Sequence, residues 1–236
     1  MFIDIKKGEI MKTIVFILFT TYILNAQSFE LEKISGNVKL LTSKDNSWID
    51  LKSKTTVTAN TIISTDKRSS VRIKGSEVSF VLNESSAISV SNIKKMSVDD
   101  LLLALAMDNV LNKPRKNGNK KSENTSTYGE NLSSETLEII NSSSFGNKRL
   151  NGAIQLAESG LIESAIISAK EIYRKYPETM SNISNRLFFA ELIFNKGLYE
   201  EALDDYSEIK LLNLNSEQKK IVDDKIEQIN KKLINK

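Results

Sequence analysis

The sequence predicts a multi-domain protein with an all-β N-terminal part and an all-α C-terminal part. Two observations support this fold class. Residues 30–95 consist of short runs rich in Val, Ile, Ser and Thr, whose polarity alternates, and residues 147–236 contain apolar residues at helical spacing together with an internal repeat. Alternation with a period of two is typical of strands with one buried face, and a period near 3.6 is typical of amphipathic helices.

The composition excludes several classes of site. With 40% hydrophobic and 27% charged residues, the chain resembles ordinary globular proteins. Its net charge of +3 is small for 236 residues, so we expect no nucleic-acid partner. The chain has no cysteine and no histidine, which excludes disulfides, the usual zinc sites, and Cys–His or Ser–His–Asp catalysis. We expect no metal and no cofactor.

Residues 1–26 have the pattern of a secretory signal peptide. A lysine precedes the apolar run Thr13–Leu24, and small or polar residues follow it, so cleavage after Ala26 would leave Gln27 as the N-terminus. An apolar helix of this length spans roughly 18 Å, less than the ~30 Å hydrocarbon core, so an uncleaved anchor is the weaker alternative. No cysteine follows the run, as a bacterial lipoprotein would require. The predicted location is the periplasm or the cell envelope.

Residues 27–96 are expected to form a β-domain. The strand-like runs lie at 36–43, 47–51, 69–75, 77–83 and 86–91, and turn-forming clusters separate them. Within the regular stretch 60–73, we expect Ile63, Val71 and Ile73 to point inward.

Two hydroxyl residues in the same stretch, Thr65 and Ser69, are predicted to lie near a turn and to satisfy backbone groups there. A surface for glycans or peptides is the alternative role for them. Trp48 offers a comparable choice, because its ring is a good platform for stacking a sugar but also a good core residue.

Residues 34–91 resemble the FecR domain. The residues that carry the resemblance are Gly36, Val38, Trp48, Leu51, Val57, Ile63, Thr65, Ser69, Val71, Ile73, the Gly75–Ser76 pair, Val78, Phe80 and Leu82. The resemblance implies a small β-domain in this part of the chain.

A helix is predicted at 97–112, where Ser97 and Asp100 have the spacing of a capping box. Because this helix is apolar nearly all round, it needs cover on more than one face. We expect it to dock on the β-domain, and a helix for a partner or for self-association is the alternative. Residues 113–146 are expected to be a flexible linker between two parts that fold separately, since residues 113–134 are almost all polar.

Residues 147–236 contain a repeat of 37 residues. The segments 159–177 and 196–214 align without a gap, pairing Gly160 with Gly197. Both segments resemble the second half of a tetratricopeptide (TPR) repeat, which implies paired helical hairpins that bind proteins. A final amphipathic helix at 216–235, with Val222, Ile226, Ile229 and Leu233 on one face, is predicted to cap the array.

The leading hypothesis is a non-catalytic exported envelope protein that binds or scaffolds envelope proteins or glycans. The alternatives are a periplasmic module of a sensing, signalling or secretion system and, less favoured, an enzyme with a Ser–Lys or paired-carboxylate site. By register with the repeat glycines, the candidate partner-binding residues are Leu150, Ile154, Leu187, Glu191, Phe194 and Asn195. Phe194 is either an anchor for a partner or a residue that packs on the capping helix.

Overall fold

The computed structural model describes residues 28–42, 44–45, 47–112 and 132–235. The strands are β1 (Ser28–Ser35), β2 (Val38–Thr42), β3 (Ile49–Asp50), β4 (Lys54–Thr58), β5 (Thr61–Thr65), β6 (Ser70–Lys74), β7 (Ser79–Leu82) and β8 (Ala87–Ser89). The helices are α2 (Val98–Asn112), α3 (Ser134–Ile140), α4 (Ser143–Glu158), α5 (Ile162–Lys175), α6 (Ile183–Asn195), α7 (Tyr199–Lys210) and α8 (Ser216–Ile234), with 3-10 turns η1 (Val90–Asn92) and η2 (Pro177–Ser181). The predicted signal peptide lies outside these residues.

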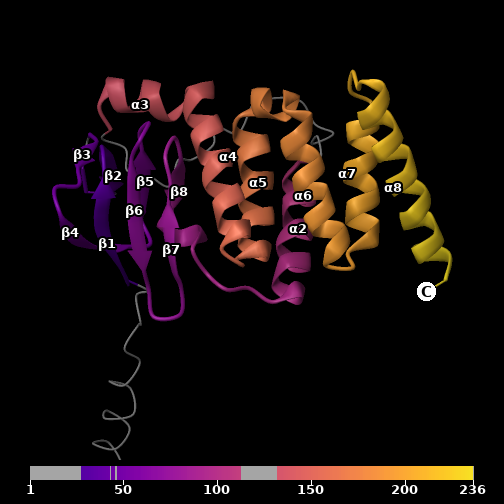
Figure 1. Ribbon diagram of the computed structural model, residues 1–236, viewed down its shortest axis with the longest axis horizontal. Helices are drawn as coiled ribbons and strands as arrows, with labels where there is room; N and C mark the ends of the chain where they lie inside the picture. The colour runs from indigo at the N-terminus through magenta and orange to yellow at the C-terminus, as the bar shows by residue number, and fades with distance from the viewer. Residues whose placement is uncertain (1–27, 43, 46, 113–131, 236) are drawn as a thin grey trace, which may run out of the picture.

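The N-terminal part is all-β and the C-terminal part is helical, as the sequence predicts (Figure 1). The strands form two four-stranded antiparallel sheets, in the orders β4-β1-β6-β7 and β3-β2-β5-β8. Ile63, Val71 and Ile73 are fully buried, which confirms their inward orientation. Alternating side chains thus supply the apolar core of this region.

The hydroxyls of Thr65 and Ser69 bond to backbone groups. The Thr65 hydroxyl donates to the carbonyl of Asn83 at 2.6 Å and accepts from the amide of Ser86 at 3.1 Å. The Ser69 hydroxyl accepts from the amide of Asn37 at 2.8 Å. Both side chains are buried, so their role here is to satisfy loop backbone and not to present a surface.

Helix α2 begins with the predicted capping box. The amide of Asp100 donates to the Ser97 hydroxyl at 3.1 Å, and the amide of Ser97 donates to the Asp100 carboxylate at 3.2 Å. The helix packs on α5 and does not dock on the sheets, contrary to expectation. Its buried Leu101 and Leu105 join the apolar cluster of the helical hairpins.

Part of the segment expected to be a linker is helical. Ser133 caps α3 by accepting from the amide of Thr136, and Ser142 caps α4 by accepting from the amide of Phe145, each at 3.2 Å. Ser133 and Ser142, which both lie in the predicted linker, are thus N-caps, a position that serine favours. Phe145 is also buried, which anchors the start of α4. Residues 113–131 lie outside the described part of the chain.

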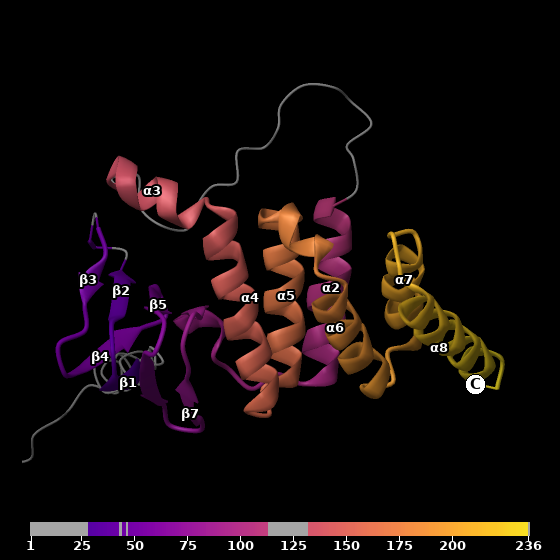
Figure 2. The same cartoon turned by 45° about the horizontal axis from the view of Figure 1, so that its top comes forward.

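The C-terminal part consists of two antiparallel helical hairpins, α4–α5 and α6–α7, followed by α8 (Figure 2). Gly160 and Gly197 take up equivalent positions between the helices of each hairpin, with φ of +84° and +77°, a conformation that favours glycine. The predicted amphipathic face of α8 is confirmed, because Val222 and Ile229 are fully buried. The 37-residue sequence repeat is therefore also a structural repeat.

The β-part and the helical part meet where α4 packs on β8. A Cβ added at Gly152 would lie 2.2 Å from the carbonyl oxygen of Ala87, so the two backbones touch. The Asn151 side chain donates to the carbonyl of Ser85 at 2.9 Å, and the Gln155 side chain accepts from the amide of Asn83 at 2.7 Å. One cluster of buried apolar side chains continues from the strands into α4 and α5. The two parts therefore share a continuous apolar core, whereas the sequence predicted that they fold separately.

Among the described residues, each helix is too short or too polar to cross a lipid bilayer.

Candidate binding cleft between α5, α6 and α7

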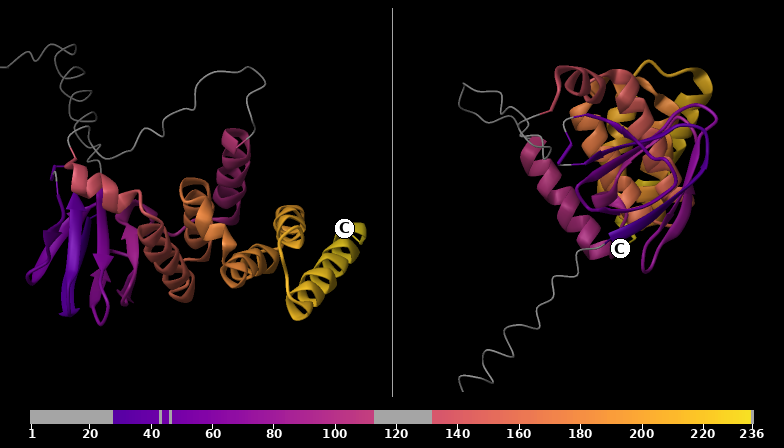
Figure 3. Two further views of the ribbon diagram at one scale, coloured as in Figure 1. Left: turned by 90° about the horizontal axis from the view of Figure 1, so that it is seen from above. Right: turned by 90° about the vertical axis from the view of Figure 1, so that its left-hand side faces the viewer.

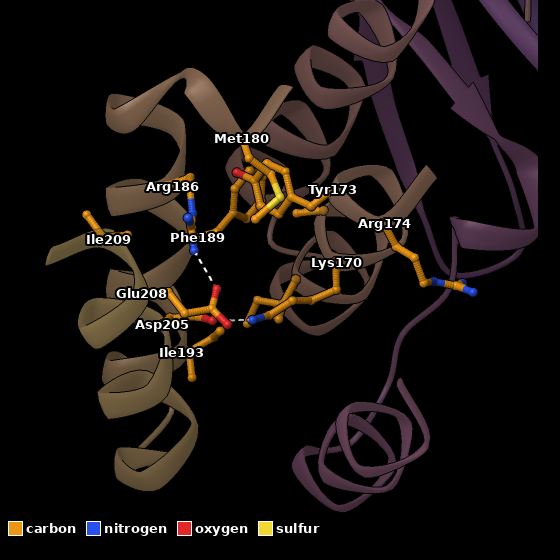
Figure 4. Close-up of a pocket in the computed structure, with 12 residues that line it drawn as sticks. Lys170, Tyr173, Arg174, Met180, Arg186, Phe189, Ile193, Asp205, Glu208 and Ile209 are labelled. Atoms are coloured by element: carbon orange, nitrogen blue, oxygen red, sulfur yellow. Dashed lines mark hydrogen bonds and ion pairs between the residues drawn. The ribbon is translucent and has the colours of Figure 1, made fainter. Parts of the chain in front are cut away.

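A cleft of about 300 Å³ lies between α5, α6 and α7, with η2 at one edge (Figure 4). We call it the hairpin cleft. Its lining residues are Ile166, Ala169, Lys170, Tyr173, Arg174, Met180, Arg186, Phe189, Ile193, Asp205, Glu208 and Ile209. It forms where the first hairpin meets the second, so it depends on the repeat.

Apolar side chains form the floor of the hairpin cleft. Ala169 of α5, Phe189 and Ile193 of α6, and Ile209 of α7 are all buried. They belong to the apolar faces on which the hairpins pack, and the cleft is the gap left where those faces diverge. An apolar floor of this kind favours binding of an apolar side chain of a partner.

Two ion pairs cross the cleft from neighbouring helices. Lys170 of α5 bonds to Asp205 of α7, and Arg186 of α6 donates to Glu208 of α7 at 2.8 Å (Figure 4). The Arg186 side chain is 6% exposed, whereas that of Glu208 is 63% exposed. Arg174 points away from both pairs in the same view. Four charged side chains of the cleft wall are thus held in two ion pairs.

The second of these pairs repeats the geometry of the first hairpin. Arg149 of α4 donates to Glu171 of α5 at 3.4 Å, and both residues lie 37 positions before Arg186 and Glu208. Arg149 is buried like Arg186. Each hairpin is therefore closed by the same buried arginine on its first helix.

Tyr173 supplies an unused hydrogen-bond donor to the cleft. Its hydroxyl is buried and has no hydrogen-bond partner among the described residues. Burial raises the pKa of this hydroxyl well above its ordinary value, an effect that nearby Arg186 opposes and Asp205 reinforces. The group therefore keeps its proton and can donate to a carbonyl or carboxylate of a ligand. A buried polar group without a partner costs free energy, which a ligand acceptor would recover.

The six predicted partner-binding residues do not line the hairpin cleft. Leu150 is fully buried, because α4 lies between β8 and α5, so its predicted exposure is wrong. Ile154 and Leu187 are half-buried against the two apolar clusters. Glu191 accepts from Tyr206 at 2.8 Å and pairs with Lys225 of α8 at 2.8 Å, and Asn195 is exposed.

Phe194 packs toward the capping helix. The Nζ of Lys225 lies 4.3 Å from the centroid of its ring, and the ring of Tyr199 lies 5.5 Å from it, centroid to centroid. The ring is half-buried among these neighbours. Of the two roles foreseen for Phe194, the structure therefore favours packing on α8 over an open anchor.

Trp48 lies where the β-sheets meet α3 and α4. Its ring packs edge-on against Phe145, with centroids 5.8 Å apart, and its Nε1 is buried without a hydrogen-bond partner in the described part of the chain. Trp48 also lines a smaller cavity of about 190 Å³, together with Asp66 and Lys148. The residue is thus partly core and partly cavity wall.

The sequence places adjacent carboxylates at Asp204–Asp205 on α7 and at Asp223–Asp224 on α8. Asp205 bonds to Lys170 as described, and Asp223 lies 2.7 Å from Lys210, while their neighbours Asp204 and Asp224 are not in these bonds. Within the described ranges, no group of three or more acidic residues is placed to hold a metal ion.

A scan against protein-family models and searches of curated proteins and solved structures gave no match for this chain. The resemblances to the FecR domain and to TPR repeats therefore stay predictions from the sequence. The protein has a β-region joined to helical hairpins, with a cleft at the contact of the two hairpins.

The sequence contains little indication of which residues line the hairpin cleft. One signal was present: Arg149 and Arg186 stand where the TPR pattern has an aromatic residue, and a charge at a core position of a repeat indicates a buried ion pair. Lys170 and Tyr173 gave none, because their spacing places them on one side of α5 but does not show that α6 and α7 complete a cavity there.

Proposed function

We propose that this chain is a non-catalytic protein of the bacterial cell envelope that binds a segment of a partner protein in the hairpin cleft. In this proposal the α4–α8 region is a TPR-like scaffold and residues 34–91 are a FecR-like β-domain. A module of a periplasmic sensing or secretion system, which would bind its partner by the same cleft, is the alternative setting.

One observation carries the proposal: the hairpin cleft combines an apolar floor with the hydroxyl of Tyr173, which has no hydrogen-bond partner among the described residues. A peptide segment suits both features, because it brings an apolar side chain and a backbone carbonyl within a few ångströms of each other. Protein groups rarely leave a buried donor unused, so an acceptor from a partner would complete the site.

The proposed location follows from the sequence of residues 1–26, which has the order of a secretory signal. N-terminal sequencing of the protein from its native host tests it. A chain that starts near Gln27 supports export with cleavage, and a membrane-bound chain that retains residues 11–26 contradicts it.

Photocrosslinking in living cells tests the binding site. A photoreactive benzoylphenylalanine replaces Met180, which lies at the edge of the cleft, and a second strain carries it at the exposed Lys219 of α8 as the matched control. We expect a discrete adduct with one envelope protein from position 180 and none from position 219. Adducts of the same kind from both positions, or none from position 180, would contradict the proposed site.

A second candidate role is glycan binding at Trp48, because its buried Nε1 has no hydrogen-bond acceptor in the part of the chain that the structure describes, and its ring lines a cavity. Trp48 is the single tryptophan of the chain, so intrinsic fluorescence reports on this site directly. Titration with soluble peptidoglycan fragments should quench or shift the emission in a saturable manner. An emission spectrum that stays constant up to millimolar glycan would remove this role.

A further inference from the structure

The cavity beside Trp48, which we call the Trp48 cavity, lies between one β-sheet and the start of the helical part. Lys39 of β2 and Ser64 of β5 both line it, and they stand directly opposite each other in the antiparallel ladder. Figure 3 shows α3 beside the strands, at the point where the chain enters α4. The volume of about 190 Å³ is below the ~300–1,000 Å³ of sites for drug-sized ligands, so the cavity suits a single small group such as one sugar ring.

The polar lining of the Trp48 cavity is rich in hydrogen-bond donors. The Nε1 of Trp48 is buried and has no acceptor among the described residues. Lys148 pairs with Asp66 at 2.7 Å, whereas Lys39 has no ion pair with any residue that the structure describes. Asp50 is opposite Lys39 on β3, but it is exposed and does not line the cavity. The cavity therefore offers two ammonium groups and an indole N–H against one carboxylate.

The first turn of α4 adds positive potential to the same cavity. Ser142, the N-cap of this helix, and Ser144 both line it. The first amides of a helix have no partner within the helix, and their partial positive charge favours an anion. The preceding helix α3 ends nearby, but the carbonyl of Ile139 already accepts from the hydroxyl of Ser142 at 2.7 Å and from its amide at 3.2 Å. The carbonyl end of α3 is thus occupied by hydrogen bonds.

We propose that the Trp48 cavity binds an acidic sugar whose carboxylate lies between Lys39 and the first turn of α4. The ring of Trp48 is an apolar wall for the C–H face of the sugar, and its Nε1 donates to a sugar oxygen. The side chain of Asp66 is 40% exposed, so it can accept from a sugar hydroxyl while it holds Lys148. A neutral sugar would leave Lys39 without an opposite charge. The inference rests on the glycan role proposed above for Trp48 and adds the charge of the ligand.

Titration of the full chain with three small probes tests this ligand class. The emission of Trp48, the single tryptophan, reports binding directly. The probes are sodium glucuronate, glucose and sodium acetate at equal ionic strength. Glucose has a sugar ring without the charge, and acetate has the charge without the ring. We expect a saturable change in emission with glucuronate, half-complete at a concentration at least about tenfold lower than with glucose or acetate.

Two neighbouring serines of α4 provide a matched pair of variants. Ser143 and Ser144 are both exposed in the first turn, but Ser144 lines the cavity and Ser143 does not. Aspartate suits this turn, so both variants should fold. Ser144→Asp should raise the glucuronate concentration at half-saturation about fivefold or more and leave that of glucose unchanged, and Ser143→Asp should do less. Lys39→Gln should act like Ser144→Asp, whereas Lys52→Gln, at an exposed position of the β-part, should have no effect.

Each failure of this test has a distinct meaning. Equal half-saturation by glucose and glucuronate would remove the preference for an acid and leave the glycan role intact. Equal half-saturation by acetate would make the cavity a site for any carboxylate, and unchanged glucuronate binding by Ser144→Asp would place the carboxylate elsewhere. No response to either sugar would contradict the glycan role as well. The peptide site is tested separately, because the described residues that line the Trp48 cavity and those that line the hairpin cleft are different.

Discussion

Arg186 is almost entirely buried and donates to a glutamate, Glu208, that is mostly in water. The same asymmetric contact joins Arg149 to Glu171 in the first hairpin, 37 residues earlier. The buried partner of each pair is the arginine on the first helix, and the acid on the second helix is the more exposed partner. This asymmetry means that the two residues of a pair contribute differently to stability.

We expect Glu208→Ala to destabilise the chain more than Arg186→Leu. Removing the glutamate leaves a buried guanidinium without its counter-charge, which costs about 1–3 kcal/mol. Replacing the arginine by leucine leaves a solvated carboxylate and an apolar side chain in an apolar site, at a cost below about 1 kcal/mol. Urea unfolding of both variants measures the order. Equal losses, or a larger loss for Arg186→Leu, would show that the pair is not asymmetric.

The sequence predicted those elements whose evidence is local. Strand alternation placed Ile63, Val71 and Ile73 in the core, and the Ser97–Asp100 spacing predicted the start of α2. The prediction was wrong where the composition was ambiguous. Ser133 and Ser142 lie in the segment that was predicted to be a linker, but they are N-caps of helices. Serine serves in both roles, so composition alone does not separate them.

The candidate site was less accessible to prediction because it depends on contacts between elements. Leu150 was expected on an open face, but it is fully buried on α4, a helix that packs against both β8 and α5. The TPR resemblance directed attention to the first helices of the hairpins, whereas much of the cleft wall comes from α5 and α7. Periodicity shows that a helix has an apolar face and does not show which neighbour covers it.

The junction of the β-part and the helical part should be sensitive to one methyl group. Gly152→Ala places a Cβ 2.2 Å from the backbone oxygen of Ala87, so α4 must shift away from β8. We expect a loss of about 1–3 kcal/mol from this overpacking, while the exposed Asn147→Ala on the same helix should change little. When the parent chain is unfolded and followed by circular dichroism, the β- and α-signals should change together in one transition. Two separate transitions in the parent chain would mean that the parts fold independently.

Alanine variants of Phe194 and of its neighbour Asn195 test whether the ring of Phe194 stabilises the fold. Phe194→Ala removes the ring contacts with Tyr199 and Lys225, so we expect a loss of about 1–3 kcal/mol. Asn195→Ala, at an exposed position, should stay within about 0.5 kcal/mol of the parent. Thermal melting decides the matter. If Phe194→Ala had the same melting temperature as the parent chain, Phe194 would again be a candidate anchor for a partner.

The stability of the chain at alkaline pH should show the effect of burying the Tyr173 hydroxyl. Its pKa is raised in the folded chain above the ordinary value of 10.0, chiefly by burial, so the unfolded chain loses this proton first. Stability should therefore be unaffected by Tyr173 below about pH 9 and should fall above pH 10, by up to about 1.4 kcal/mol per pH unit for this group. Tyr173→Phe should remove that contribution. Denaturation midpoints of parent and variant between about pH 8 and pH 11 measure it, and parallel curves would contradict the buried state of the hydroxyl.

The most direct test of the account is the effect of Tyr173→Phe on the crosslink formed from position 180. The hydroxyl has no hydrogen-bond partner in the described chain, so its removal should leave the melting temperature unchanged or slightly raised. Tyr176→Phe is the contrasting control, because its hydroxyl donates to the carbonyl of Ile140 at 2.5 Å and its loss should lower the melting temperature. If a partner segment accepts a hydrogen bond from the Tyr173 hydroxyl, Tyr173→Phe should reduce the crosslink yield roughly three- to tenfold at unchanged stability. An undiminished yield in a stable Tyr173→Phe chain would contradict the proposed binding site.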